Sequence, residues 1–423
     1  MLNSEDKRYT AFMHEQQTPH FVGLDVGTSM VRCVIGTVDP SDSTRAAIVG
    51  HGSSVNYGMR KGVVAHIDDV SEAVSQALNE AERVSGFTIN KATVNVNGSH
   101  VSGMNSRGVI AISTANREVT NEDRLRAEEA ATIVNLPPNK EIIQIFAKNY
   151  RVDGQDNIKD PVGMHGVRLE VDTHIVTAAT PNVKSLETAL DKANVDISHK
   201  TVSSLAAAEA VLNRQQKEAG TLLLDIGAGT TNMVIIEDGE VHYVGVIPIG
   251  SNHITNDLAI GLKTDLDIAE KVKLEHGNLH NTTNKKNIKV KTGKQEHIFE
   301  VQEVEMIIEA RLDELFHLVE KELKRINKSQ RLPGGVVIVG GCAKLPGITD
   351  FAKEKLQLAT RVGKLQPIGG LVDTVSDISY STAVGMMLLD MYLLPQSAQP
   401  KGKLNDKVFG AVEGVWKRFK NKR

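Results

Sequence analysis

A short stretch near the middle of the chain joins an apolar strand, an acidic residue and a glycine-rich turn. It runs from Thr221 to Thr231 as Thr-Leu-Leu-Leu-Asp-Ile-Gly-Ala-Gly-Thr-Thr, and an apolar run resumes after it. Glycines let backbone N–H groups approach and cradle phosphate oxygens. Thr230 and Thr231 can donate hydroxyl hydrogens, and Asp225 can hold a hydrated Mg2+ that contacts the phosphates. Taken alone, the pattern also fits an ordinary β-hairpin with a glycine turn.

The same pattern occurs near the N-terminus, which weakens the ordinary-hairpin interpretation. Phe21-Val-Gly-Leu-Asp25-Val-Gly27-Thr28-Ser29 is again a strand, an aspartate, a glycine turn and hydroxyl groups, and an apolar run follows. The two aspartates are 225 − 25 = 200 residues apart. The repeat predicts two related half-domains that face one nucleotide.

A third glycine turn follows a buried strand in the second half of the chain. Its sequence is Val336-Val-Ile-Val339-Gly340-Gly341-Cys-Ala-Lys-Leu-Pro346-Gly347. Backbone without side chains at this point would suit stacking against an adenine or a ribose. The Walker signature Gly-x-x-x-x-Gly-Lys-[Ser/Thr] is absent, so a P-loop nucleotide-binding protein is not indicated.

Composition excludes several other classes. The chain has 423 residues, enough for two or more domains, and its net charge of −3 does not point to nucleic acid. Aromatic residues make up only 4%, which also argues against a base-stacking surface. Cys33 and Cys342 are expected to be reduced packing residues of a cytosolic protein. The polar residues 1–20 contain no apolar signal core and are expected to form a mobile tail.

Local patterns predict an insertion after the first glycine turn and several elements after the second. Residues 87–166 form a strand–helix–strand block without a phosphate-type turn, and Thr120 and Asp123 suit the start of its helix. Residues 285–299 resemble a small hairpin that turns at Gly293. Apolar residues three or four apart between Ile308 and Ile326 predict a long helix.

The set of motifs resembles bacterial cell division proteins of the FtsA family, within the actin/Hsp70/sugar-kinase superfamily. Besides the three turns, the likeness rests on motifs in the second half of the chain, and it covers about residues 20–423. These motifs are Ala206-Ala-Ala-Glu209-Ala-Val-Leu, Ile247-Pro248-Ile-Gly250, Ile254-Thr-Asn-Asp257-Leu-Ala, Ala269-Glu270-Lys-Val-Lys273-Leu-Glu-His-Gly277 and Glu309-Ala-Arg311-Leu-Asp-Glu-Leu.

The resemblance implies an α/β, actin-like (ribonuclease H-like) two-lobed ATPase fold, with an inserted α+β subdomain and a C-terminal amphipathic helix. It implies ATP with Mg2+ between the halves, self-association into filaments, and attachment of the tubulin-like protein FtsZ through its C-terminal tail. It places the protein on the cytoplasmic face of the inner membrane at the division site. It also implies that later division proteins bind through the inserted subdomain.

The resemblance also divides the chain into actin-like subdomains. The expected parts are an N-terminal tail (1–20), subdomain 1A (21–86, 167–200 and 373–394), inserted subdomain 1C (87–166), subdomain 2A (201–248 and 306–372), subdomain 2B (249–305), a linker (395–404) and a membrane-targeting helix (405–423).

Site residues follow from the same resemblance. Asp25 and Asp225 would lie near the metal, mostly through its waters, and an exposed ion pair is the alternative interpretation for Glu270 and Lys273. The residues expected to hold the nucleotide are Gly27, Thr28, Ser29, Gly227, Gly229, Thr230, Glu270, Lys273, Gly340 and Gly341.

One departure from related ATPases bears on turnover. Bacterial actins of the MreB type have Glu-Pro-x-Ala-Ala-Ala before the second phosphate strand, whereas this chain has Ser203-Ser204-Leu205-Ala-Ala-Ala. A serine hydroxyl is a poor general base at neutral pH. Glu209 is six residues out of register. We therefore expect slow hydrolysis at most, with no assigned catalytic residue and ATP acting as a structural ligand that closes the cleft.

For the FtsZ tail, the family implies a surface on subdomain 2B and the start of the long helix. Arg311 and Lys294 are the candidate contacts. Several lysines make the nearby hairpin basic, although a solvated lysine face is the simpler explanation for any one of them.

Residues 405–423 predict an amphipathic membrane-surface helix. One side carries Val408, Phe409, Val412, Val415, Trp416 and Phe419. The rest includes Lys417 and Arg418, and six basic against two acidic residues give 6 − 2 = +4. Trp416, the chain's single tryptophan, suits the headgroup boundary. A helix docked on the protein itself or on a partner is the alternative.

Two other functions share this fold. A sugar-kinase-like phosphotransferase would need a second polar pocket with a catalytic aspartate, which the sequence does not display. A PilM-like pilus-assembly protein is the closer alternative, and the basic amphipathic end favours the division protein.

Overall fold

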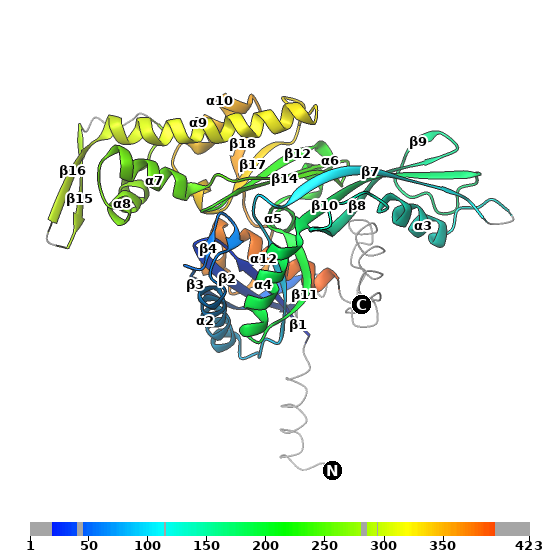
Figure 1. The fold of residues 1–423 in the computed structure, drawn as a ribbon, viewed down its shortest axis with the longest axis horizontal. Helices are drawn as coiled ribbons and strands as arrows, with labels where there is room; N and C mark the ends of the chain where they lie inside the picture. The colour runs from blue at the N-terminus through cyan, green and yellow to red at the C-terminus, as the bar shows by residue number, and fades with distance from the viewer. Residues whose placement is uncertain (1–18, 40–44, 114–115, 281–285, 294, 394–423) are drawn as a thin grey trace, which may run out of the picture.

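The computed structural model describes residues 19–39, 45–113, 116–280, 286–293 and 295–393. Two sheets dominate it, one in each half of the chain (Figure 1). Among the described helices, none combines the length and the apolar character that crossing a bilayer requires. The expected N-terminal tail, linker and C-terminal helix lie outside the described residues, apart from Pro19 and His20 at the end of the tail.

The first sheet has the strand order β11-β6-β1-β2-β3-β19. Strands β1 to β3 form an antiparallel meander, whereas β6 and β11 run parallel to β1. The strands are β1 (His20–Val26), β2 (Met30–Val38), β3 (Ala46–Val55), β6 (Lys91–Val96), β11 (Asp196–Val202) and β19 (Gly369–Gly370). Helices α2 (Ile67–Ser85), α4 (Thr180–Lys192) and α12 (Ser381–Tyr392) pack with this sheet in one core.

The second sheet repeats the topology of the first. Its order is β14-β13-β12-β17-β18, in which β12 to β14 form the antiparallel meander and β17 and β18 run parallel to β12. The strands are β12 (Thr221–Ile226), β13 (Thr231–Glu237), β14 (Glu240–Ile247), β17 (Gly335–Val339) and β18 (Thr360–Val362). The shared order β3-β2-β1-β6-β11 and β14-β13-β12-β17-β18 confirms that the two halves are related.

Burial explains why the central strands are so apolar. All residues of β12 and β17 are buried, as expected for strands with neighbours on both sides and helices over the faces. The long helix α9 (Val301–Arg325) covers the second sheet with a stripe of buried side chains that includes Ile308, Leu312 and Leu323. This confirms the predicted long helix.

The remaining elements of the second half are short. Helices α7 and α8 and the hairpin β15–β16 form one end of the molecule (Figure 1). Gly293 has a φ of +61° at the hairpin turn, as predicted. The elements are α5 (Ser203–Val211), α6 (Arg214–Ala219), α7 (Ser251–Gly261), α8 (Leu266–His276), β15 (Asn287–Thr292), β16 (Gln295–Glu300), η1 (Gly341–Lys344), α10 (Ile348–Leu356), α11 (Val372–Val375) and η2 (Ile378–Tyr380).

The inserted unit projects from the opposite end (Figure 1). It is a four-stranded sheet of order β7-β10-β8-β9 with one helix and its own small core. The elements are β7 (Ser102–Ala111), α3 (Asn121–Ala131), β8 (Lys140–Val152), β9 (Gln155–Ile158) and β10 (Arg168–Ala179). Thr120 caps α3 in a capping box with Asp123, as the sequence predicted.

Strand pairing shifts the bounds of this insertion from the expected 87–166. Strand β6 pairs with β1 and β11 and so belongs to the first sheet. Strand β10, which we expected in the first domain, pairs along its length with β7 and β8. Pairing between strands tens of residues apart leaves no local trace in the sequence, so the pattern alone misplaced both ends.

Two helices cross between the halves, where small residues allow close approach. A Cβ atom on Gly385 of α12 would overlap the carbonyl oxygen of Ala206 in α5. A Cβ atom on Gly23 of β1 would overlap the carbonyl oxygen of Ala383 in α12. The two short helices therefore hold the first sheet and the second half in contact.

Candidate nucleotide site

Two tight turns carry the first two glycine motifs. The N–H of Gly27 donates to the carbonyl oxygen of Met30 (3.0 Å), and the N–H of Gly227 donates to that of Thr230 (2.9 Å). The ladder of each hairpin ends before the turn, so the residues at its tip lie outside the sheet. Both predicted cradles therefore exist as turns at corresponding positions of the two halves.

These turns meet directly across the two halves. A Cβ atom on Gly229 would lie 2.7 Å from Thr28 Oγ1 and 3.1 Å from the Cα atom of Lys61. Lys61 belongs to the turn between β4 (Met59–Arg60) and β5 (Val63–Val64), and the N–H of Gly62 donates to Thr28 Oγ1 (3.1 Å). The residues predicted to hold phosphates thus converge at one point, together with a lysine-bearing hairpin that the sequence analysis did not include.

The two aspartates lie behind these turns at the ends of equivalent strands. Both are buried, with exposed fractions of 8% for Asp25 and 7% for Asp225. The pKa of Asp25 is raised to about 7. Burial is the main cause, the charge of Asp225 adds to it, and the charge of Arg32 opposes both. Burial likewise raises the pKa of Asp225 to about 6, opposed by Asn232, Thr382 and Arg32. Buried acids with raised pKa values are typical of functional sites.

This acid pair fits Mg2+ bound with a nucleotide. Mg2+ is usually held through one or two carboxylates, its own waters and substrate phosphates. Among the described residues, no group of three or more His, Cys, Asp or Glu side chains is placed to hold a metal alone. Asp25 and Asp225 would therefore hold a hydrated ion between themselves and the phosphates, and its charge would offset the cost of ionising both buried acids.

The raised pKa values predict how stability depends on pH. An acid whose pKa is higher when folded stabilises the fold below its ordinary value, near 3.8, and that stability is lost as pH rises through about 7 for Asp25. Between pH 4 and 8 we expect Asp25→Asn to gain stability relative to the nucleotide-free wild type, on the order of a few kcal/mol. Urea unfolding at several pH values measures this. The exposed control Asp373→Asn should follow the wild type. A pH-independent difference for Asp25→Asn would contradict the assignment.

Polar residues that the sequence analysis missed hold Asp25 in place. Asn95 donates through Nδ2 to Asp25 Oδ1 (2.6 Å) and to Ser203 Oγ (3.0 Å), and its Oδ1 accepts from the N–H of Val26 (2.8 Å). Arg32 pairs with Asp25 in the β1–β2 ladder. The hairpin register could have revealed Arg32, but nothing local indicated Asn95.

The serines before the second turn are not arranged as bases. Ser203 Oγ accepts a hydrogen bond from Asn95, and Ser204 Oγ is buried without a hydrogen-bond partner among the described residues. Neither side chain has a neighbouring base in the hydrogen bonds of the described chain. Slow hydrolysis stays a prediction.

The two glycines of the third turn, Gly340 and Gly341, have different roles. Gly340 has a φ of +84°, and a Cβ atom there would lie 2.6 Å from Asp225 Oδ1, so this glycine makes room for the carboxylate. A Cβ atom on Gly341 would meet no atom within 4 Å. Only Gly341 therefore faces open space, where a nucleoside has room.

Glu270 and Lys273 form an ion pair of 2.6 Å along α8. Only the lysine is buried: the Lys273 side chain is 8% exposed and also donates to Thr255 Oγ1 of α7 (2.8 Å), whereas the Glu270 side chain is 40% exposed. Both charges act on Cys342 in η1, whose pKa burial raises to about 11. The pair thus lies beside the third turn, and its contact with a nucleoside stays a prediction.

Of the two residues expected to contact the FtsZ tail, only Arg311 lies among the described residues. Arg311 is held by Asp257 through two hydrogen bonds, from Nε to Oδ2 (2.5 Å) and from Nη2 to Oδ1 (2.9 Å). Its guanidinium therefore already has a bidentate partner within the protein. Lys294 lies outside the described residues, as do the membrane-helix residues from Val408 to Phe419.

Comparison with known proteins identifies the family. The family model "Cell division protein FtsA" matches residues 222–385, and the model "SHS2 domain inserted in FTSA" matches residues 98–177. The chain is 34% identical to cell division protein FtsA of Borreliella burgdorferi over 87% of this chain and 90% of the relative. It is 34% identical to that of Neisseria meningitidis over 94% and 95%, and 35% identical to that of Bacillus subtilis over 87% and 82%.

Solved structures confirm the actin-like fold. A PilM–PilN type IV pilus biogenesis complex aligns with a TM-score of 0.62 at 16% identity, covering 88% of this chain and 98% of that chain. MreB5 of Spiroplasma citri bound to ADP aligns with a TM-score of 0.53 at 13% identity, covering 88% and 96%. At these identities the likeness concerns the fold alone. The relatives and the two matching models, in contrast, show that the chain belongs to the FtsA family of cell division proteins.

Proposed function

We propose that this protein binds ATP with Mg2+ between its halves, assembles into filaments on the cytoplasmic face of the inner membrane, and tethers the FtsZ ring there. In this proposal the inserted subdomain contacts neighbouring copies and helps recruit later division proteins. One observation supports nucleotide binding: Gly229 lies against Thr28 across the two halves, with two buried aspartates behind these turns. The family carries the division role.

In this proposal ATP is a structural ligand that closes the cleft and is not rapidly hydrolysed. The phosphate turns belong to different halves and touch each other, so a nucleotide bound by both would hold the halves together. Ser203 is engaged by Asn95 and lacks a base, which supports slow turnover at most.

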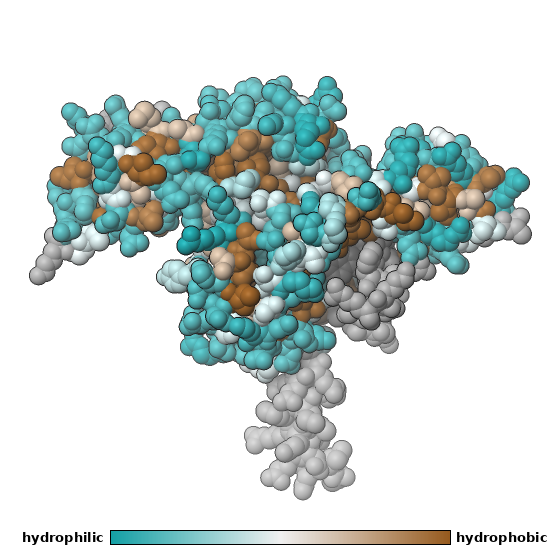
Figure 2. Space-filling view, in the orientation of Figure 1, coloured by the Kyte–Doolittle hydropathy of each residue, from teal (hydrophilic) through white to brown (hydrophobic). Residues whose placement is uncertain are grey.

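The FtsZ tail would bind at the end formed by α7, α8, the β15–β16 hairpin and the start of α9. Large apolar side chains are exposed there, and Figure 2 shows hydrophobic patches at this end of a mostly hydrophilic face. The exposed side chains are Ile260, Leu266, Leu274, Ile298 and Met306. An apolar surface beside basic residues suits a tail of mixed apolar and acidic character.

Charge reversal on the hairpin tests this placement. We expect Lys291→Glu combined with Lys294→Glu to weaken binding of an FtsZ C-terminal peptide by about tenfold in a fluorescence titration, because favourable charge is replaced by repulsion. Arg311 is a poorer test position, because its removal breaks the pair with Asp257.

The matched control is Lys184→Glu on α4, an exposed lysine of the first half. Unchanged affinity of the hairpin variant would place the tail elsewhere. Absence of any tail binding by the wild-type chain would favour the PilM-like alternative over the division role.

Membrane attachment would come from residues 405–423. The full chain should sediment with anionic liposomes, whereas a chain ending at Pro400 and the Trp416→Glu variant should stay mostly in the supernatant, because apolar insertion and basic charge act together. A single copy should bind weakly, and filaments should bind firmly through many copies. Equal sedimentation of all three proteins would remove this segment from the mechanism.

A further inference from the structure

A polar cavity of about 830 Å³ lies where the inserted sheet meets the second sheet. The insert contributes residues of β7, β8, β9 and β10 and Lys159 just after β9, and the second half contributes Asp238 of the β13–β14 turn and His242 of β14. Every lining residue is polar or charged, and the cavity is distinct from the residues of the nucleotide site. Such a set of polar side chains suits a small ligand that accepts and donates hydrogen bonds.

Lys148 is a cation of this cavity that has no ion-pair contact among the described residues. Its ammonium group donates to Asn105 Oδ1 (2.9 Å), which is a neutral acceptor. Among the described residues, no carboxylate forms an ion pair with it. Burial lowers the pKa of Lys148, and the nearby charge of Lys328 lowers it further, against the effect of Asp172. A partly buried cation whose nearby carboxylate, that of Asp172, is engaged by other cations favours binding of an anion.

Apart from the Asp238 carboxylate, the other charged side chains that line the cavity already have partners. Asp172 accepts from Arg107 Nε (2.8 Å) and from Arg151 Nη2 (2.9 Å). Lys159 donates to the carbonyl oxygen of Asp238 (2.6 Å) and lies 3.4 Å from Glu218. These pairs engage Asp172 and Glu218, and the Asp238 carboxylate, which has no such pair, acts on His242 rather than on Lys148.

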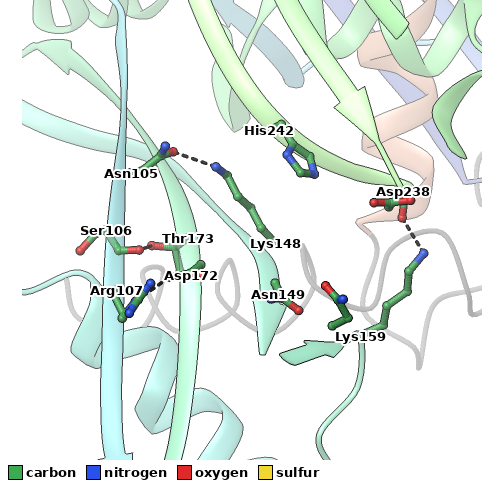
Figure 3. A pocket seen from close by; sticks show the side chains of 11 residues that line it. Asn105, Ser106, Arg107, Lys148, Asn149, Lys159, Asp172, Thr173, Asp238 and His242 are labelled. Carbon is green, nitrogen blue, oxygen red and sulfur yellow. Dashed lines mark hydrogen bonds and ion pairs between the residues drawn. The ribbon is translucent and has the colours of Figure 1, made fainter. Parts of the chain in front are cut away.

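The second half adds His242 opposite Lys148. Figure 3 shows Lys148 between Asn105 and His242, with Lys159 and Asp238 farther along the wall. Burial lowers the pKa of His242, and the charge of Lys148 lowers it further, against the effect of Glu237, whose Oε2 lies 3.8 Å from His242 Nδ1. The charge of a bound anion would oppose both effects and favour an imidazole that donates to it.

Hydrogen bonds around Asn105 fix the position of its side chain in the cavity wall. His174 Nδ1 and Asn105 Oδ1 are 2.8 Å apart, and His174 Nε2 accepts from the N–H of Val244 in β14 (3.0 Å). Burial lowers the pKa of His174 to about 3, so the ring is neutral and carries its proton on Nδ1, which donates to Asn105. Asn105 therefore receives from both His174 and Lys148, and its position is set by the joint between the insert and β14.

We propose that this cavity is a binding site for a phosphate group, held between Lys148 of the insert and His242 of the second half. Planar carboxylates are best matched by a free arginine, and the lining arginine, Arg107, is occupied by Asp172. A lysine acts as a point charge that suits the tetrahedral phosphate dianion. The amides of Asn149 and Asn157 supply further donors along the wall. Because the anion would touch both units, its binding would favour one position of the insert relative to the second half.

The test uses the full chain with histidine rings labelled for NMR, because His242 reports on this cavity and the nucleotide site contains no part of it. Inorganic phosphate, glycerol phosphate and citrate are titrated separately. We expect either phosphate compound to shift the His242 signals saturably, and Lys148→Gln to weaken that binding by about tenfold or more. The preferred phosphate compound identifies the source as free phosphate or a phosphate ester. Asn157→Asp, at an exposed position of the rim, should weaken binding without altering the cavity floor.

Lys184→Gln is the control, since Lys184 lies on α4 of the first half. Unfolding midpoints of all variants establish that the fold is intact. Equal phosphate affinity in the wild type, Lys148→Gln and Asn157→Asp would overturn the proposal. Citrate binding as tightly as the phosphate compounds would also overturn the assignment to phosphate.

Discussion

Replacing Gly385 by alanine should destabilise the protein by about 3 kcal/mol or more. We expect this to be the largest loss among the glycine-to-alanine substitutions in the described part of the chain. Gly385 lies in α12 against α5, and the added Cβ atom would overlap the carbonyl oxygen of Ala206. Because the obstacle is backbone, no side-chain rotation relieves it, and the two helices must move apart. Urea unfolding of the purified chain measures the loss.

Gly341→Ala is the matched control for this substitution. It adds the same methyl group where no atom lies within 4 Å, and its φ is not in the left-handed region. Its unfolding midpoint should match that of the wild type. Equal midpoints for Gly385→Ala and the wild type would mean that the helices do not pack as closely as this structure has them.

Moving α12 should also disturb the nucleotide site. Thr382, one turn before Gly385, lies 3.5 Å through Oγ1 from Asp225 Oδ2. A displaced α12 withdraws this contact from the acid that we assign to the metal. We therefore expect Gly385→Ala to weaken nucleotide binding in addition to stability.

Gly341→Val should abolish nucleotide binding and leave the stability of the free protein nearly unchanged. The side chain would enter the open space beside the third turn, where we propose the nucleoside, and its Cβ atom would meet no atom within 4 Å in the free protein. A loss of about a hundredfold or more in affinity for a fluorescent ATP analogue is expected, because the overlap is with the ligand itself. Unfolding of the nucleotide-free protein provides the stability measurement.

Gly229→Leu gives the informative comparison. This variant should also lose the nucleotide, but its side chain would press on Thr28 and on the backbone of Lys61, so stability should fall as well. The two variants therefore separate an effect on the ligand from an effect on the contact between the halves. Normal nucleotide affinity in Gly341→Val would move the nucleoside away from this turn.

The sequence predicted the repeated parts of the architecture well. The strand–aspartate–glycine pattern at Asp25 and Asp225 indicated two related halves, and the two sheets have the same strand order. The capping box at Thr120, the hairpin turn at Gly293 and the long helix from Val301 to Arg325 also follow local patterns. In each case a short-range property, such as side-chain period, a cap or a permitted φ, leaves its mark within a few residues.

Contacts between distant segments could not be predicted in this way. Asn95 supports Asp25 across 70 positions, Arg311 is held by Asp257 across 54, and β10 joins the insert's sheet rather than the first sheet.

The sequence by itself determined the two halves, the glycine turns and the family, because those features are local and repeated. Tertiary structure alone decided which glycine makes room for Asp225 and which faces open space, and it alone formed the cavity around Lys148. The physical reason is that strand register and helix crossing bring together side chains whose partners lie far away in the chain. Burial then sets their charge states, and burial is a property of the assembled fold.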